Sequence, residues 1–449
     1  MKSRFQALWL LMCAVALLLV AMGCNDTLRQ FITPIPPPTG DPGALEHGIT
    51  LSTNPVPSAS GSDMHIDVSG DTNVGVVPVG INPVFLGKST NRIFSINSGD
   101  VSTPPTVSVY LALLPQLATV TTVTLPNAAG NPVAGGTSSA GNIYIANSAS
   151  NAVDVISGAV LAVTATINLP AGDTQPVMIA GNAANNQIFV VNHGSNTVTQ
   201  ISAIDNTVVK SIPVGSQPIW AVMSTDGLFV FVVNQGAGTV SVIDTSLQSV
   251  IATIPVGITP ATASPNFAFY ESKLKRVYVS NTGEGTVSVI RADSISATNL
   301  PVKLKDIPIS GTPASVTALS DGTKAYAALG NCPAGVNHLT ILSQLGSCNG
   351  NLVSVIDAVG LHEIRTVPVG TGAVSIDASA DASRVFVVNA HDSVTDASGT
   401  HTAGTISDIR TSTDTEVGRK LAPQQDPNCK VSSSVFCPTQ TPFIVRTFP

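Results

Sequence analysis

Charged and aromatic residues are scarce in this chain of 449 residues, where they make up 10% and 4% of the total. A helix-rich protein needs Glu, Lys, Leu and Gln on its exposed faces. The shortage of these residues therefore disfavours a helical fold. Gly, Pro, Ser, Thr, Asn and Val are plentiful instead, which is typical of an all-β protein with many turns.

Positive charge is also sparse. The formal net charge is −7, and no dense run of Lys or Arg appears beyond the first few residues. We expect no nucleic-acid partner, because proteins that bind nucleic acid carry a basic patch or stripe. The chain also lacks a G-x-S-x-G nucleophile motif and a GxxxxGK[ST] phosphate loop. The sequence thus indicates no cofactor and no familiar catalytic motif.

The N-terminus has the features of a bacterial export signal. Lys2 and Arg4 precede an almost wholly apolar run from Ala7 to Ala21. That run has the length of a signal-peptide core and is short for a membrane span. We expect residues 1–23 to be a signal peptide that directs the protein out of the cytoplasm.

The end of the signal resembles a lipobox, in which a cysteine becomes the lipidated N-terminus of the mature protein. Gly23 and Cys24 match the motif, whereas Ala21 and Met22 depart from its usual residues. The resemblance implies lipid attachment at Cys24 and anchoring to a bacterial membrane, on the periplasmic or the cell-surface side. An ordinary signal cut nearby is the alternative.

A proline-rich segment follows the lipobox. Residues 33–42 read TPIPPPTGDP, and proline favours an extended, semi-rigid spacer. We expect residues 24–61 to form a tether that holds a folded body, residues 62–449, away from the membrane.

Four further cysteines lie in two close pairs. Cys332 and Cys348 flank one loop, and Cys429 and Cys437 flank another. Paired cysteines fit an oxidising compartment, and neither spacing is that of a zinc knuckle. We expect a Cys332–Cys348 and a Cys429–Cys437 disulfide.

A unit of about 45 residues recurs between residues 74 and 421. Each unit opens near a Pro-Val-Gly turn, as at Pro213–Gly215 and Pro255–Gly257. An aromatic-led strand then ends in Asn, and an alternating strand such as Thr239–Asp244 follows. Period-2 alternation indicates strands, and a fixed period of four short strands is typical of propeller blades.

At these residues the resemblance becomes specific. Tyr278–Asn281 followed by Thr286–Ile290 is similar to the YVTN family of β-propeller repeats, as is Phe231–Asn234 followed by Thr239–Asp244. The family implies a β-propeller, usually of seven blades, in extracytoplasmic proteins, and no shared catalytic residues. The count of seven units favours seven four-stranded antiparallel blades. Terminal strands near residues 64–68, 74–79, 431–436 and 442–448 leave an eighth, closing blade possible.

The repeated residues have a structural explanation, because every blade contains them. We expect each terminal Asn to serve its own turn, where Asn tolerates left-handed backbone. We expect the glycine of Pro-Val-Gly to supply a turn conformation that other residues adopt at a cost. Function should lie where the repeat is broken.

Three loops between the second and third strands are longer than the four residues of units 2 to 5. They span Ser98–Pro105 in unit 1, Gly330–Asn351 in unit 6 and Ala390–Gly404 in unit 7. All should emerge on one face, where long loops on a rigid scaffold usually bind partners. In a seven-bladed ring these units are consecutive, whereas an eighth blade would separate units 7 and 1 and loosen the patch.

These loops carry the candidate binding residues, which are Asp100, His338, His391, Asp392, Asp396 and His401. Imidazole and carboxylate groups suit divalent metals, so His391, Asp392 and His401 are weak metal candidates. No HxH or HExxH spacing supports them, and we predict no metal site and no catalytic residue.

Three functions remain open. The leading hypothesis is a non-enzymatic interaction module, membrane-tethered by its lipid, that binds an envelope protein or polymer through the loops of units 6, 7 and 1. The first alternative is a propeller hydrolase, lactonase-like or metal-dependent. The second is a structural surface protein without a specific ligand, since propellers serve many unrelated functions.

Overall fold

The structure of the protein is a computed structural model. It describes residues 47–449 except 69–71, 90–91, 112–119, 128, 182–185, 294, 297–298, 397, 431, 433–434 and 449. The predicted signal peptide, Cys24 and most of the predicted tether lie outside the described residues. No helix in the described part of the chain has the length and apolar character needed to span a bilayer.

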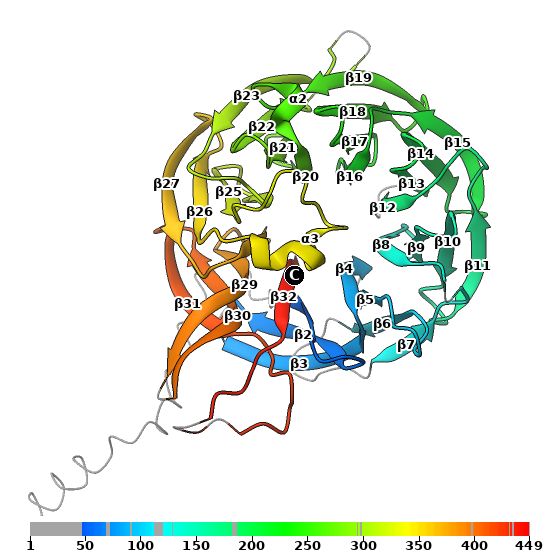
Figure 1. Ribbon diagram of the computed structural model, residues 1–449. Coiled ribbons are helices and arrows are strands. Elements are labelled where there is room, and N and C mark those ends of the chain that lie inside the picture. The colour runs from blue at the N-terminus through cyan, green and yellow to red at the C-terminus, as the bar shows by residue number, and fades with distance from the viewer. Residues whose placement is uncertain are drawn as a thin grey trace, which may run out of the picture. The chain divides into compact units, whose positions relative to one another are not determined.

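Eight four-stranded antiparallel sheets form a ring of blades, numbered here so that blades 1 to 7 match the sequence units (Figure 1). From inner to outer strand, blade 1 contains β4 (Pro83–Ser89), β5 (Arg92–Asn97), β6 (Thr106–Leu111) and β7 (Thr121–Thr124), and blade 2 contains β8 (Pro132–Thr137), β9 (Ile143–Asn147), β10 (Ala152–Ile156) and β11 (Val163–Asn168). Blade 3 contains β12 (Pro176–Ala180), β13 (Gln187–Asn192), β14 (Thr197–Ser202) and β15 (Thr207–Pro213). Blade 4 contains β16 (Pro218–Met223), β17 (Phe229–Asn234), β18 (Thr239–Asp244) and β19 (Ser249–Pro255).

Blades 5 to 7 follow the same order. Blade 5 contains β20 (Pro265–Glu271), β21 (Arg276–Asn281), β22 (Thr286–Arg291) and β23 (Val302–Pro308). Blade 6 contains β24 (Ser315–Ala318), β25 (Lys324–Leu329), β26 (Leu352–Asp357) and β27 (His362–Pro368). Blade 7 contains β28 (Ala373–Ala378), β29 (Arg384–Asp396), β30 (Gly399–Arg410) and β31 (Thr415–Leu421). A short helix, α2 (Pro260–Ala263), precedes blade 5.

Blade 8 closes the ring with strands from both ends of the chain. Its inner strand is the C-terminal β32 (Thr441–Phe448), followed outward by β1 (His47–Thr53), β2 (Ser60–Asp67) and β3 (Thr72–Ile81). Such closure removes exposed strand edges. The eight-bladed alternative is therefore the correct one, and the favoured count of seven is wrong.

The strands that make up the closing blade differ from the expected ones. The sequence suggested two strands from each terminus, whereas three come from the N-terminal side and one from the C-terminal side. β1 lies within residues 24–61, so the folded body begins earlier in the chain than the predicted tether allowed. Residues 431–436 form no strand in their described part, where only an isolated bridge joins Ser432 and Val435.

The core lies within and between the blades. The second strand of each repeat unit contributes one aromatic side chain that is almost fully buried, in chain order Phe94, Tyr144, Phe189, Phe231, Tyr278, Tyr326 and Phe386. This regular burial explains why the repeat keeps an aromatic residue at that position.

The repeated Asn is structural, as expected, but by a different mechanism. Asn234 lies at the end of β17 and donates from Nδ2 to Thr239 Oγ1 (3.0 Å) and Ser241 Oγ (2.9 Å) on the neighbouring strand. It thus joins two strands rather than bonding its own turn. In blade 6, Leu329 replaces this Asn, and the equivalent hydroxyl of Ser354 has no partner among the described residues.

The repeated Gly adopts the expected turn conformation at Gly257, where φ is +75°, and has another reason at Gly215 and Gly370. A Cβ atom on Gly215 would lie 2.7 Å from the side chain of Asn234, and one on Gly370 would lie 2.7 Å from that of Asn389. Neither glycine adopts a positive φ. The close approach of the Asn side chain therefore excludes any larger residue at these two positions.

Blade 8 meets blade 1 through a buried carboxyl group. Asp63 on β2 is fully buried and accepts hydrogen bonds at Oδ2 from Ser95 Oγ (2.7 Å) and Tyr110 OH (2.7 Å) of blade 1. Burial raises the pKa of Asp63 to about 7, against the two hydrogen bonds, which lower it. We therefore expect the stability of the contact between blades 8 and 1 to depend on pH.

We predict that this carboxyl group makes the folded protein less stable as pH rises. Below about pH 4, Asp63 is protonated in both states. Between about pH 4 and 7 the unfolded chain releases the proton while the folded chain retains it, which costs up to roughly 4 kcal/mol by pH 8. Urea unfolding of wild type and Asp63→Asn at several pH values should show a difference in unfolding free energy that changes across this range. Parallel pH profiles would contradict the prediction.

Candidate functional site

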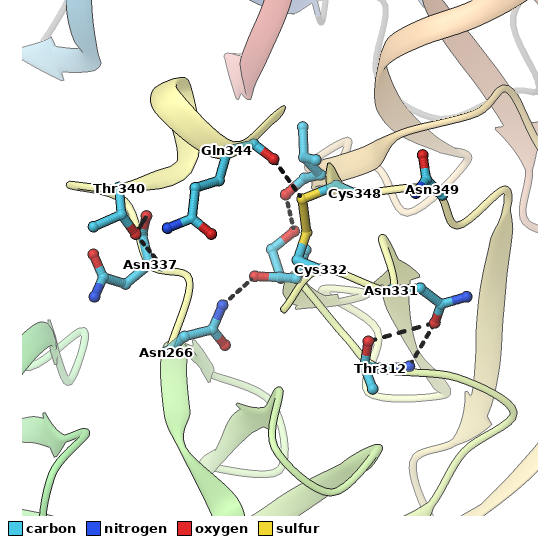
Figure 2. Close-up of a disulfide and its surroundings, with 12 residues drawn as sticks. Asn266, Thr312, Asn331, Cys332, Asn337, Thr340, Gln344, Cys348 and Asn349 are labelled. Carbon is cyan, nitrogen blue, oxygen red and sulfur yellow. Dashed lines mark hydrogen bonds between the residues drawn. A yellow bond between two sulfur atoms is a disulfide. The ribbon is translucent and has the colours of Figure 1, made fainter. Parts of the chain in front are cut away.

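The long loop of blade 6 forms a plug, defined here as residues 330–351. It contains α3 (Ile341–Gln344) and η1 (Leu345–Ser347). The predicted disulfide between Cys332 and Cys348 is present and ties the two ends of the plug together (Figure 2). The plug is anchored to the blade beneath it, because Asn331 Oδ1 accepts a hydrogen bond from the backbone N–H of Thr312 at 2.8 Å.

The plug crosses the central channel, where Figure 1 shows α3. Asn337 donates from Nδ2 to Gln235 Oε1 of blade 4 at 2.8 Å. The Nε2 atom of His338 lies 2.8 Å from the carbonyl oxygen of Val177 on β12, in blade 3. The His338 ring also packs edge-on against Trp220, with 5.1 Å between centroids. A loop from blade 6 is thereby fastened to the opposite side of the ring.

A cavity of about 60 Å³ lies beneath the plug. Its walls come from the plug and from the innermost strands of six blades, which are β4, β16, β20, β24, β28 and β32. The wall is largely apolar, with Phe85, Trp220, Phe267 and Phe443 among its residues, and no Asp or Glu lines it among the residues that the structure describes.

His338 is the one predicted site residue that reaches this cavity. Burial lowers the pKa of its imidazole to about 4, although the bond to the Val177 carbonyl favours the charged form. The ring is consequently neutral near pH 7. Nothing in the spacing of the sequence indicated that a loop of blade 6 would bring this histidine to the channel.

The long loop of blade 7 is a β-hairpin that continues β29 and β30 beyond the blade. Asp392 lies at its base, where its carboxylate pairs with Arg419 at 2.9 Å. Asp396 lies near its tip, and hydrogen bonds from Ser398 lower the pKa of this carboxyl group. His401 contacts Asp396 at 3.5 Å.

The weak metal candidates do not converge. His391 faces the plug, with Nε2 3.3 Å from Asn349 Oδ1, while Asp392 binds Arg419 and His401 stacks on Phe436. Within the residues that the structure describes, no three His, Cys, Asp or Glu side chains come close enough together to hold a metal ion. The three side chains instead join the hairpin to its neighbours.

The segment that links blade 7 to β32, residues 422–440, packs against the same hairpin. The predicted disulfide between Cys429 and Cys437 is present in it. The rings of Phe436 and His401 stack with 4.1 Å between centroids, and Thr439 Oγ1 accepts a hydrogen bond from the backbone N–H of Gly404 at 2.8 Å.

The same face continues through blade 8 to blade 1. In the β1–β2 turn, residues 54–59, Asn54 donates from Nδ2 to the carbonyl oxygen of Gln425 at 3.1 Å. Ser58 of this turn donates from Oγ to Asp100 in the loop of blade 1 at 2.6 Å. This hydroxyl is the largest influence that lowers the pKa of Asp100.

These contacts join five segments into one surface, the loop ridge. Its segments are 330–351, 390–404, 422–440, 54–59 and 98–105. As expected for eight blades, blade 8 separates the loops of blades 7 and 1. The closing blade fills the gap with its own two loops, which the repeat pattern could not reveal because they belong to no repeat unit.

Comparison with solved structures shows the same fold in proteins of very different sequence. Dihydro-heme d1 dehydrogenase NirN, in a complex with DHE, is similar with a TM-score of 0.63 and 13% identity, over 91% of this chain and 76% of its own. The periplasmic gluconolactonase PpgL of Pseudomonas aeruginosa is similar with a TM-score of 0.52 and 14% identity, over 73% and 97%. No family model and no curated protein sequence matches the chain. At these identities the likeness establishes the propeller fold alone.

We predict that the Cys332–Cys348 disulfide keeps the plug closed over Trp220. In Cys332→Ser/Cys348→Ser the ends of the plug are no longer held together, so the loop gains freedom. Trp220 is the only tryptophan beyond Trp9, and its fluorescence should shift to longer wavelength and become easier to quench with acrylamide.

The matched control is Cys429→Ser/Cys437→Ser, which removes the other disulfide. It should leave Trp220 fluorescence unchanged, because residues 422–440 contact the blade 7 hairpin rather than the channel. Identical spectra for all three proteins would show that the disulfide does not hold the plug.

Proposed function

We propose that this protein is an exported, lipid-anchored interaction module that binds a protein partner at the cell envelope through the loop ridge. The observation that carries the proposal is the continuity of the ridge over four consecutive blades, 6, 7, 8 and 1. Each segment contacts the next through a hydrogen bond or stacked rings. A preorganised surface loses less entropy on binding than separate mobile loops.

The composition of the ridge supports a protein partner. Large apolar side chains are exposed on four of its segments, namely Val56, Val101, Leu339 and Val435. Segments of the ridge also carry polar and charged groups, including Asp100, Asp396 and His401. Apolar contacts within a polar rim are the usual anatomy of a protein interface.

The anchor rests on the sequence. The lipobox-like residues that end in Cys24 and the similarity to YVTN repeats both point to an extracytoplasmic protein. The two disulfides agree with this location, because disulfides persist in oxidising compartments.

A propeller hydrolase is the alternative, and the fold similarity to a gluconolactonase is consistent with it. Such an enzyme would need an acid–base pair or a metal-activated water at the channel. The described part of the cavity lining contains no Asp or Glu, and the plug is bonded across the channel to Gln235 and Val177. For this reason we favour the interaction module over the hydrolase. A surface protein without a specific ligand is the remaining alternative, and the binding experiment below tests it directly.

We predict that charge placed at the apolar points of the ridge abolishes partner capture. The variant is Val101→Asp/Val435→Asp, in which both side chains are exposed and the fold has no need of them. Quantitative cross-linking in native envelopes should lose one or more specific partners, because desolvating a carboxylate at an interface is costly.

The control is Val160→Asp, in a β10–β11 turn that emerges on the opposite face and is also exposed. It should retain every cross-linked partner of the wild type. A ridge variant with an unchanged partner set would refute the proposal and favour the structural surface protein.

We also predict that Cys24→Ser releases the protein from the membrane. Without a thiol at this position no lipid can be attached, so the full chain should move from the membrane pellet to the soluble fraction. Mass spectrometry of the wild-type N-terminus should show an acylated Cys24. An unmodified N-terminus at another residue would indicate ordinary signal cleavage.

A further inference from the structure

The cavity beneath the plug contains a cation without an ionic partner. Arg446 lies on β32, the inner strand of the closing blade, and lines the cavity. Within the described residues, the only hydrogen bond of its guanidinium runs from Nη1 to the carbonyl oxygen of Val445 at 2.9 Å, and the guanidinium forms no ion pair but lies 6.0 Å from the centroid of the Phe267 ring. Burial lowers the pKa of this guanidinium, which the charge of Asp377 partly offsets. A guanidinium has five N–H donors, so most of them are available to an anion.

The same cavity contains an unsatisfied acceptor. The Nε2 atom of His338 faces a carbonyl oxygen, which can only accept, so Nε2 must be the protonated nitrogen. The other ring nitrogen, Nδ1, is buried and has no partner among the described residues. Because the imidazole is neutral, Nδ1 offers a lone pair to a donor such as a hydroxyl group.

The remaining wall restricts the size and charge of an occupant. Among the described residues, Arg446 is the only Lys or Arg that lines the cavity, which favours a monoanion over a dianion. Trp220 and Phe267 pack together with 4.6 Å between ring centroids and form an apolar side. A volume of about 60 Å³ is room for about four or five non-hydrogen groups, since one water needs roughly 10–15 Å³ on the same measure.

We propose that this cavity is a binding site for a small carboxylate that carries an α-hydroxyl group. The carboxylate pairs with the Arg446 guanidinium, and the hydroxyl donates a hydrogen bond to His338 Nδ1. Arg446 comes from the closing blade and His338 comes from the plug, so the site exists only when the ring is closed and the plug is in place across the channel.

This inference does not depend on the loop ridge as a binding surface. The plug is one segment of the ridge, but the exposed ridge residues Val101 and Val435 do not line the cavity, whereas Arg446 and His338 do. The variant Val101→Asp/Val435→Asp should therefore bind the small ligand as wild type does, whatever happens to its envelope partners.

Isothermal titration calorimetry with glycolate, near neutral pH, tests the proposal on the full wild-type chain. Two probes of similar size separate the two contacts. Glycolamide has the hydroxyl without the charge, and acetate has the charge without the hydroxyl. We expect glycolate to bind at least about tenfold more tightly than either, because each probe leaves one buried group unpaired.

Variants assign the contacts to residues. Arg446→Gln should weaken glycolate binding by about tenfold or more, whereas Arg365→Gln, which removes an exposed arginine from β27, should leave it unchanged. His338→Phe removes the Nδ1 acceptor together with the Nε2 hydrogen bond to the Val177 carbonyl, so it should abolish the preference for glycolate over acetate.

The comparison of probes on the wild type remains decisive even where Arg446→Gln fails to fold. Equal affinity for glycolate and glycolamide would overturn the role of Arg446, and equal affinity for glycolate and acetate would overturn that of His338. No detectable heat from glycolate at concentrations up to about 10 mM would reject the site altogether.

Discussion

The pairing of β32 with β1 is the constraint on which the rest of this protein depends. It joins the last strand to the first over seven register pairs, from His47 opposite Phe448 to Thr53 opposite Thr441. Without it, blades 1 and 7 would each face an incomplete neighbour, and sheets with open edges are prone to mispairing. Closure also positions the residues on which both proposals depend, because residues 54–59 follow β1, residues 422–440 precede β32, and Arg446 lies on β32 itself.

The repeated part of the fold follows directly from the sequence. Alternation, the terminal Asn and the Pro-Val-Gly turn predict the strands of blades 1 to 7, since every unit meets the same neighbours and so keeps the same residues. The break at Leu329 was visible for the same reason, and the three long loops were found by comparison with their short counterparts. Both disulfides were predictable because their cysteines lie close together in the chain.

The parts that were missed depend on contacts between distant residues. β1 has no repeat motif, since its blade is assembled from both termini, and so it was assigned to the tether. The path of the plug is set by single bonds to Val177 and Gln235, more than one hundred residues earlier in the chain. His391, Asp392 and His401 share one loop in the sequence, but the hairpin directs them to three different partners. The repeat pattern shows that these loops are unusually long, but it does not predict which residues they contact.

Hydrogen–deuterium exchange of the intact protein is the most direct test of ring closure. The amides of His47–Thr53 and Thr441–Phe448 are paired in the closing blade, so they should exchange as slowly as those of the central strands of blade 4 and should open together. Fast exchange in either segment, with the other blades still protected, would contradict the account, because neither the loop ridge nor the cavity beneath the plug could then persist as described.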